Sequence, residues 1–361
     1  MGRNTRDRMP LIAAALFVVL GTAVVATGGW LARGSRAGGL HAYVPDGTVP
    51  RISFSGDPVD ASMVRDFDVL DGELYLLDVA ASRVVVLADS SGEWKAVRSF
   101  GRPGQGPGEL NAPSGIAVLP VTGEVIIADN SVLHRFTRAG EYIETQHPAL
   151  PCTLGLPHLD AVGDALLLSG RCLHGDTMRA ELHWLPRIQA DTAVRVAYDP
   201  LYSISNGGSP FAASAFFGGG GGHGLFGGGA SGCLARVDLQ SRPPAATTTC
   251  AVAASRYALV PDEELKQKSK ALAASRPWAA AAFELPDELP VFLDRVVWDG
   301  RDYLLRPFST DSAVLREVGS EKDLVITGLT DLIGCREAGC LWVSQEDVPR
   351  VMFLPRDRIL P

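Results

Sequence analysis

One short pattern of hydrophobic and polar residues recurs along the chain. A glycine and a polar residue are followed by three or four apolar residues and then by a polar residue. The copies span residues 72–78, 123–129, 163–169, 222–228, 300–306 and 339–345, and the copy at 222–228 is degenerate, with glycines among its apolar positions. Short apolar runs bounded by turn residues are typical of strands that are buried on both faces. Each copy therefore predicts a tight turn followed by a buried strand.

Further strands flank these copies. The pattern predicts strands before most of them at 67–70, 116–119, 159–162 and 295–298, and after them at 83–87, 133–136, 181–185, 234–239, 314–318 and 350–354. Units of about 40 residues without intervening helices are typical of the blades of a β-propeller. The sequence predicts an all-β fold, a six-bladed β-propeller over residues 50–356. A single β-sandwich is the alternative, but sandwiches do not repeat one pattern in this way.

Two segments fall outside the repeat. Residues 51–54 form a short apolar strand, and we expect it to complete the last blade and close the ring, which protects a sheet edge. Residues 255–290 lie in a long gap between the fourth and fifth units. Pro261 and the acidic residues after it are typical of a helix start. We therefore expect a partly helical surface insertion there and not a blade.

The N-terminal segment predicts a membrane helix. Residues 9–32 are uncharged and follow three arginines, and a helix of this length exceeds a bilayer core of about 30 Å. We expect residues 1–32 to be a cytoplasmic tail and signal anchor and residues 33–49 a linker. The propeller would then lie outside the cytoplasm, in the periplasm or the extracellular space. A signal peptide cleaved near residues 24–26 is the alternative, and both alternatives export the rest of the chain.

The charge of the chain argues against one class of partner. The formal net charge is −8, although the first 36 residues hold five arginines and one aspartate. The remainder is therefore more acidic than the whole, and no run of lysines and arginines follows Arg36. Because phosphate backbones are repelled by such a surface, nucleic-acid binding is not expected.

The cysteines agree with export. All six lie beyond residue 150, and an exported chain holds such cysteines as disulfides. Pairing between neighbours is the simplest arrangement, because each bond would close a short loop within one unit: Cys152–Cys172, Cys233–Cys250 and Cys335–Cys340. Six reduced, buried thiols are the alternative. A structural zinc site is not expected, because no pair has the C-x-x-C spacing.

One loop carries a family resemblance. Residues 100–110, FGRPGQGPGEL, with Pro113 just after them, resemble the inter-blade loop of bacterial six-bladed β-propellers of the NHL-repeat type. Residues 123–140 are similar to the core of an NHL repeat, and the match is good over 64–145 and weak afterwards. We expect this loop to be a crossover between blades, in which Glu109 accepts backbone hydrogen bonds. Many such proteins are exported and have no assigned activity, so the resemblance implies a fold more than a function.

Known catalytic motifs are missing from the sequence. It contains no H-E-x-x-H, no G-x-S-x-G and no phosphate-binding P-loop. Asp78 and Asp129 close the second strands of two units, and we expect them to cap turns by accepting backbone N–H bonds. The starts of the innermost strands would ring one channel mouth. The residues expected there are Arg65, Asp66, Ser114, His158, Asp294, Arg295 and Asp331.

Three hypotheses for function follow. The first is a non-catalytic module that binds a protein or a small polar ligand at the channel mouth, with no cofactor or with one divalent cation such as calcium. The second is a metal-dependent hydrolase resembling the lactonases and esterases among six-bladed propellers, in which Asp66, Asp294 and Asp331 hold a cation that activates water. The third is an envelope scaffold whose insertion at 255–290 docks a partner. Ion pairing among the blades is an alternative role for all the mouth residues.

Overall fold

The computed structural model describes most of the expected propeller. The described residues are 40–41, 51–53, 57–58, 60–90, 93–150, 155–187, 190, 192–203, 215–220, 222–228, 234–249, 258–261, 267, 270–271, 274, 289–290, 294–309, 312–318, 323–327, 331–344 and 350–359. The expected membrane helix at 9–32 lies outside them, as do Cys152, Cys233 and Cys250. Within the described residues, no helix has the length and apolar character needed to cross a membrane.

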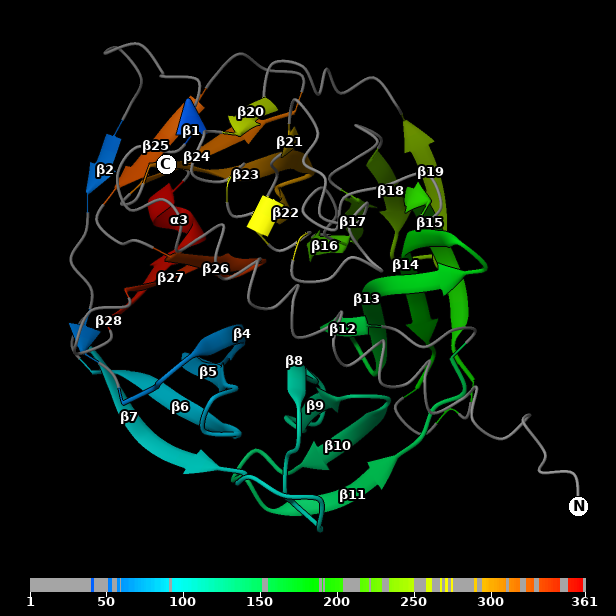
Figure 1. The fold of residues 1–361 in the computed structure, drawn as a ribbon. Helices are drawn as coiled ribbons and strands as arrows, with labels where there is room; N and C mark the ends of the chain where they lie inside the picture. Colours follow the sequence, from blue (N-terminus) through cyan, green and yellow to red (C-terminus); the bar gives the residue numbers. More distant parts are fainter. Residues whose placement is uncertain are drawn as a thin grey trace, which may run out of the picture.

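Six antiparallel sheets stand around a central channel (Figure 1). Blade one contains β4 (Val64–Leu70), β5 (Glu73–Asp78), β6 (Arg83–Ser90) and β7 (Glu93–Phe100). Blade two contains β8 (Pro113–Val118), β9 (Val125–Asp129), β10 (Val132–Phe136) and β11 (Tyr142–Gln146). Blade three contains β12 (Gly155–Val162), β13 (Ala165–His174), β14 (Thr177–Leu185) and β15 (Val194–Ser203).

The second half of the ring repeats this order. Blade four contains β16 (Ala215–Gly220), β17 (His223–Gly228), β18 (Leu234–Asp238) and β19 (Ala245–Thr249). Blade five contains β22 (Asp294–Trp298), β23 (Arg301–Ser309), β24 (Ser312–Glu317) and β25 (Asp323–Thr327). Blade six contains β26 (Asp331–Arg336), β27 (Gly339–Ser344) and β28 (Arg350–Pro355). The prediction of an all-β, six-bladed propeller is confirmed, and each predicted strand overlaps a strand of these blades.

The ring closes slightly later in the chain than predicted. The outer strand of blade six is β3 (Asp57–Pro58), which pairs antiparallel with β28. The predicted closing strand at 51–54 corresponds to β2 (Arg51–Ser53), which instead pairs parallel with β25 and adds a fifth strand to blade five. That assignment was wrong because the chain passes the outer edge of blade five before it reaches blade six, and both edges accept a strand.

A small extra sheet lies outside the blades. It joins β1 (Leu40–His41), β20 (Ala258–Pro261) and β21 (Leu289–Pro290). Two of its strands come from the segment expected as an insertion, and the described residues Gln267, Lys270, Ala271 and Ala274 of that segment are helical.

The apolar core lies between the blades, and the second strand of blade one shows why. Successive side chains of a strand point to opposite faces of its sheet. Leu74 and Leu76 pack with residues of blade six, whereas Tyr75 and Leu77 pack with residues of blade two. All four are fully buried. Burial of one such leucine contributes about 1.5–3 kcal/mol, so the continuous apolar run in each repeat reflects packing against two neighbours.

Glycines bring blades four and five into close contact. Gly218 of β16 is buried, and a Cβ atom added there would lie 1.6 Å from the carbonyl oxygen of Arg295 in β22. Since no side chain fits in that space, the inner strands of the two blades approach through backbone. Gly218, which precedes the degenerate fourth copy of the repeat, is therefore a packing requirement of this interface.

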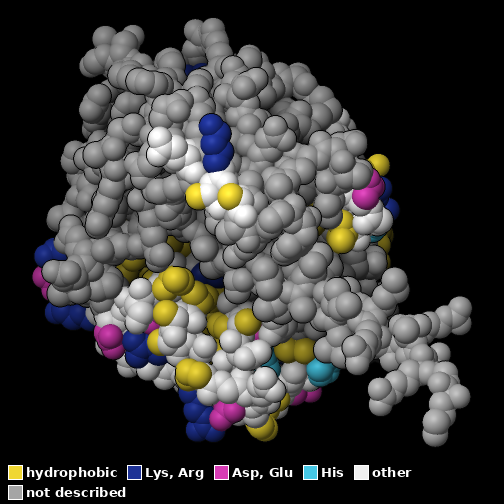
Figure 2. Space-filling view, in the orientation of Figure 1, with side chains coloured by type: hydrophobic (Ala, Val, Ile, Leu, Met, Phe, Trp, Pro, Cys, Tyr) yellow, Lys and Arg dark blue, Asp and Glu magenta, His cyan; other side chains and the backbone are white. Residues whose placement is uncertain are grey.

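An ion-pair network joins blades one and two at the outer rim. Arg98 Nη2 and Tyr75 Oη donate to Glu73 Oε2 at 2.8 and 2.7 Å, and Arg138 Nε of blade two donates to the same oxygen at 2.9 Å. The Arg98 bonds, helped by Tyr75 and Arg138, lower the pKa of Glu73 to about 2 although partial burial opposes them. Figure 2 shows side chains of both charges mixed along this part of the rim.

We predict that Gly218→Ala destabilises the propeller strongly. The methyl group would force the backbones of β16 and β22 apart, at a cost of about 3 kcal/mol in the free energy of unfolding. The neighbouring Gly219→Ala is the control, because its Cβ would meet side-chain atoms and no backbone: the end of Leu239 at 3.1 Å and the ring of Phe217 at 3.2 Å. Urea denaturation measures both variants. Equal stabilities of the two variants would contradict the close approach.

We predict that Glu73→Gln lowers stability at neutral pH by about 2 kcal/mol, because charge-assisted hydrogen bonds are lost. A carboxylate with a lowered pKa stabilises the fold above its unfolded pKa, here 4.5, and loses this contribution as the pH falls towards about 2. The difference between wild type and variant should therefore shrink across this window in denaturation curves. Glu93→Gln, at a side chain 65% exposed, is the control and should match wild type throughout.

Candidate functional site

Two aspartates expected to cap turns hold the loops that lead into the inner strands. Asp78 accepts the backbone N–H groups of Ser62 and Met63, each at 3.0 Å. Asp129 accepts those of Asn111 and Ala112 at 2.6 and 2.8 Å. The capping role is confirmed, and it positions the first residues of β4 and β8.

The glycine-rich loop after β7 is the expected crossover between blades one and two. Glu109 Oε2 accepts the N–H of Gly106 at 2.8 Å, as predicted, and Arg102 Nε donates to Oε1 at 3.0 Å. Gly104 has φ of +150°, and a Cβ there would lie 2.0 Å from Glu109 Oε2. The loop therefore has a structural role that explains its glycines.

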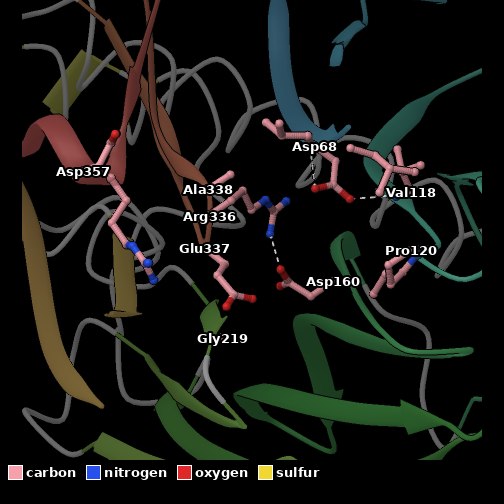
Figure 3. Close-up of a pocket in the computed structure, with 13 residues that line it drawn as sticks. Asp68, Val118, Pro120, Asp160, Gly219, Arg336, Glu337, Ala338 and Asp357 are labelled. Carbon is pink, nitrogen blue, oxygen red and sulfur yellow. Dashed lines mark hydrogen bonds and ion pairs between the residues drawn. The ribbon is translucent and has the colours of Figure 1, made fainter. Parts of the chain in front are cut away.

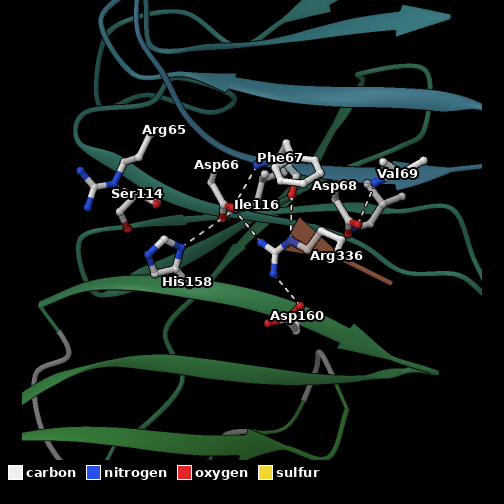
Figure 4. Close-up of polar contacts among 11 residues, drawn as sticks. Arg65, Asp66, Phe67, Asp68, Val69, Ser114, Ile116, His158, Asp160 and Arg336 are labelled. Carbon is white, nitrogen blue, oxygen red and sulfur yellow. Dashed lines mark hydrogen bonds and ion pairs between the residues drawn. The ribbon is translucent and has the colours of Figure 1, made fainter. Parts of the chain in front are cut away.

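Asp66 lies at the centre of a polar cluster in the channel (Figure 4). Its Oδ1 accepts the N–H of Phe67 at 2.9 Å and Arg336 Nη2 at 2.7 Å. Its Oδ2 accepts the N–H of Ile116 at 3.0 Å and lies 3.7 Å from His158 Nδ1. A carboxylate has about four acceptor positions, so three hydrogen bonds within the protein use most of those of Asp66.

Arg336 connects three blades across the channel. It extends from the end of β26 in blade six, and its Nε donates to the carbonyl of Phe67 in blade one at 3.1 Å. Nη1 donates to Asp160 Oδ1 in blade three at 2.6 Å, and the guanidinium carbon lies 5.7 Å from the centre of the Phe67 ring. One cation thus neutralises carboxylates from two other blades.

Asp68 lies two residues after Asp66 on β4 and, like Asp66, accepts backbone N–H groups from its own strand and from β8. Asp68 Oδ1 accepts the N–H of Val69 at 2.8 Å, and Oδ2 accepts the N–H of Val118 at 2.7 Å. Alternate residues of β4 therefore bind alternate N–H groups of β8, because both strands have a period of two. These side chains take the place of a backbone ladder between the inner strands of blades one and two.

The two aspartates differ in their electrostatics. Burial acts to raise the pKa of Asp66, but Arg336, His158 and the Ile116 N–H outweigh it and hold that pKa below its ordinary value. Burial raises the pKa of Asp68 to about 6, because Arg336 and two backbone N–H groups offset it only in part. Asp66 is therefore ionised at neutral pH, whereas Asp68 titrates close to it.

The structure brings together four of the predicted mouth residues. Arg65 Nε donates to the carbonyl of Ser114 at 3.2 Å, and these two residues lie beside Asp66 and His158 (Figure 4). Arg295 is buried at the start of β22. Asp294 and Asp331 begin β22 and β26, but their side chains lie outside the described part of the structure.

Two central residues escaped the sequence analysis: Asp68 and Arg336. Asp68 had a usable signal, because it lies two positions after Asp66 and so shares its face of β4. Arg336 gave no such signal, since it ends its strand just before a turn. Its role follows from the ring, which places the end of β26 opposite β4 and β12.

A cavity of about 530 Å³ opens at the ends of the inner strands (Figure 3). Its walls come from the ends of β4, β8, β12 and β26, together with Gly219 of β16 and the first residues of α3 (Arg356–Ile359). The lining mixes charged groups such as Asp160 and Glu337 with apolar residues such as Val69 and Pro120. The predicted mouth residues lie towards the starts of the same strands, so the cavity is at the other end of the channel.

A cluster of polar side chains in blade three has the spacing of a metal site but not the ligand chemistry. Among the described residues, the group of candidate ligands close enough for one ion is Cys172, His174 and Glu181. Cys172 is disulfide-bonded, so its sulfur is not a thiolate ligand. The buried Glu181 carboxylate lies 2.7 Å from His174 Nε2 and 3.0 Å from His183 Nε2. Arg195 Nη1 donates to the same carboxylate at 3.4 Å, so the buried charge has its partners within the blade.

Comparison with known proteins does not assign this chain to a family. No known family model and no curated protein sequence matches the chain. Solved structures with a similar fold include a gluconolactonase from Xanthomonas campestris, at 11% identity and a TM-score of 0.47 over 87% of this chain and 100% of that one. A luciferin-regenerating enzyme has 9% identity and a TM-score of 0.46 over 83% and 93%. The calcium-binding protein regucalcin from Agrobacterium tumefaciens has 11% identity and a TM-score of 0.42 over 82% and 88%.

We predict that Arg336→Met lowers the free energy of unfolding by about 3–5 kcal/mol, because it leaves the Asp66 and Asp160 carboxylates without their cation. Guanidinium chloride denaturation at neutral pH measures the loss. Arg301→Met is the matched control: this arginine is 64% exposed and lies 3.7 Å from Glu317, so its loss should cost less than about 1 kcal/mol. If both variants unfolded at the same denaturant concentration, the stabilising role of Arg336 across the channel would be refuted.

Proposed function

We propose that this chain is an extracytoplasmic binding module that takes a small ligand in the cavity at the ends of its inner strands. The observation that carries the proposal is the cavity itself, whose volume of about 530 Å³ falls within the range of about 300–1,000 Å³ typical of small-molecule sites. Apolar walls and a few fixed polar groups are the usual composition of such sites.

The rigidity of the lining supports this role. Asp68 and Arg336 both line the cavity, and each is held by hydrogen bonds to other blades. A ligand that meets a preformed site loses less free energy in ordering it. The propeller therefore offers a fixed set of groups at the cavity without a folding step on binding.

The disulfide between Cys335 and Cys340 supports export. It joins β26 to β27 next to the cavity residues Glu337 and Ala338. Disulfides persist in oxidising compartments, so we infer that the propeller lies outside the cytoplasm. The anchor at residues 9–32 and the assignment to NHL-type propellers are parts of the same proposal.

Binding is favoured over metal-dependent hydrolysis by the state of Asp66. This residue would be a ligand in the hydrolase hypothesis, yet three hydrogen bonds from N–H donors use most of its acceptor positions, and His158 Nδ1 lies 3.7 Å from its Oδ2. The guanidinium of Arg336 already supplies the positive charge that a cation would bring. A divalent ion at Asp66 would have to displace that guanidinium.

We predict that a screen of small polar compounds yields ligands that raise the melting temperature of the propeller, and that Ala338→Trp abolishes the effect. Ala338 is an exposed cavity residue, so an indole there fills the mouth without disturbing the core. Ala96→Trp on the exposed face of β7 is the control and should bind like wild type. A stabilising ligand raises the free energy of unfolding in proportion to the logarithm of its concentration above Kd.

The proposal fails if no compound shifts the melting temperature of the wild-type protein. It also fails if Ala338→Trp retains wild-type affinity for every compound that does, because binding would then occur elsewhere.

A further inference from the structure

We propose that the channel mouth at the starts of the inner strands binds a small oxyanion, either a carboxylate or a phosphate. This site lies at the other end of the channel from the cavity of the proposed function, and it is independent of that function. It is built by Arg65 of β4 and His158 of β12. Each of these side chains is fixed through one nitrogen atom and presents its outer nitrogens to a ligand.

Arg65 is held at the mouth through one atom of its guanidinium. Nε donates to the carbonyl oxygen of Ser114 in β8 at 3.2 Å, which joins this side chain of blade one to blade two. Among the described residues, neither Nη1 nor Nη2 donates a hydrogen bond, and no carboxylate lies at ion-pair distance from them. A guanidinium carries five N–H donors, so both amino groups of Arg65 remain for a ligand.

The positive charge of Arg65 is only partly compensated within the protein. Burial lowers the pKa of this guanidinium, the nearby Asp66 carboxylate opposes that effect in part, and the like charge of Arg171 adds to it. Asp66 is not available to pair with Arg65, because its oxygens already accept Arg336 and two backbone N–H groups. An anion at the Nη atoms would stabilise the charged guanidinium and reduce its repulsion with Arg171.

His158 supplies a second donor on the same side of the channel. Its Nδ1 lies 3.7 Å from Asp66 Oδ2, so the ring presents Nε2 away from that carboxylate. Figure 4 shows the His158 ring and the Arg65 guanidinium on one side of Asp66, opposite Arg336. The His158 side chain is 35% exposed, so a ligand from solvent can reach it. When the imidazole is protonated, Nε2 donates to an oxygen of the ligand.

Arg171 adds positive charge on the same face of blade three as His158. It follows Ser169, the strand partner of His158, by two residues, and residues two apart on a strand share a face. Blades one and three therefore both present cationic groups to the mouth.

These groups select an anion over the other small ligands. A metal ion would meet the guanidinium of Arg65 and would find the oxygens of Asp66 already bonded. The oxygens of a carboxylate or a phosphate match the planar fork of a guanidinium. The net charge of −8 repels a long phosphate chain, whereas a small anion meets only the mouth.

Isothermal titration calorimetry of the full chain at constant ionic strength tests the class. The probes are sodium propionate, propionamide and sodium phosphate. Propionate and propionamide share one apolar body and differ in charge. We expect propionate to bind at least tenfold more tightly than propionamide, because only the anion gains charge-assisted hydrogen bonds from the guanidinium. The affinities of propionate and phosphate then identify which kind of oxyanion the mouth prefers.

Variants locate the anion. Arg65→Gln removes the charge but keeps an amide that can donate to Ser114, and it should weaken anion binding about tenfold. His158→Phe keeps a ring without a donor and should weaken it as well. Arg301→Gln removes an arginine of blade five that is 64% exposed, and it is the matched control that should bind like wild type. Melting curves show that each variant is folded before titration.

The outcomes separate this inference from the proposed function. Failure of both anions to bind the wild-type protein would overturn it, and so would equal affinities for propionate and propionamide. Wild-type affinity in both Arg65→Gln and His158→Phe would overturn it as well. Anion binding that is abolished by Ala338→Trp would place the anion in the cavity, which would refute the mouth site and leave the proposed function in place.

Discussion

Neighbouring blades of this propeller are held together by side chains. In the described part of the chain, the strands of each blade pair within one sheet, so backbone hydrogen bonds mainly stabilise single blades; the strand β3, which precedes blade one and pairs with β28 of blade six, adds a backbone link where the ring closes. Apolar side chains on both faces of every blade supply most of the contact, as Leu76 and Leu77 do towards blades six and two. At the channel, polar side chains hold neighbouring blades together. The strands there line an opening, so they cannot bury their inner edges in apolar contacts alone. Asp66 and Asp68 bind the N–H groups of Ile116 and Val118 there.

The sequence predicted the parts of the fold that depend on local pattern. A strand that is buried on both faces has a continuous run of apolar residues in the sequence, and the turn before it has a glycine. The copies of the repeat could therefore be counted directly from the sequence. The error at residues 51–54 has a different origin, since a short edge strand carries no information about which of two adjacent sheets it joins. The sequence did not show why blade four is rich in glycine. The approach of Gly218 to the backbone of Arg295 explains one of these glycines, and it depends on how two blades meet.

The candidate site was harder to predict from the sequence, because it too depends on contacts between blades that are far apart along the chain. Asp66 and His158 could be found as polar residues on inner strands, but their partner Arg336 is 270 residues from Asp66 along the chain. Only closure of the ring brings the two together. Arg336 neutralises Asp66 and Asp160 within the protein. The channel centre is therefore a structural element, and the cavity at the strand ends is open to a ligand.

Amide hydrogen exchange tests the central claim that side chains at the channel hold the ring closed. The amides of Ile116 and Val118 lie on the inner edge of β8, where no strand of blade two can protect them. If the Asp66 and Asp68 carboxylates bind them, both should exchange as slowly as the amides in the middle of β9 at neutral pH. Exchange of these two amides at the rate of exposed loop amides, while β9 stays protected, would contradict the account.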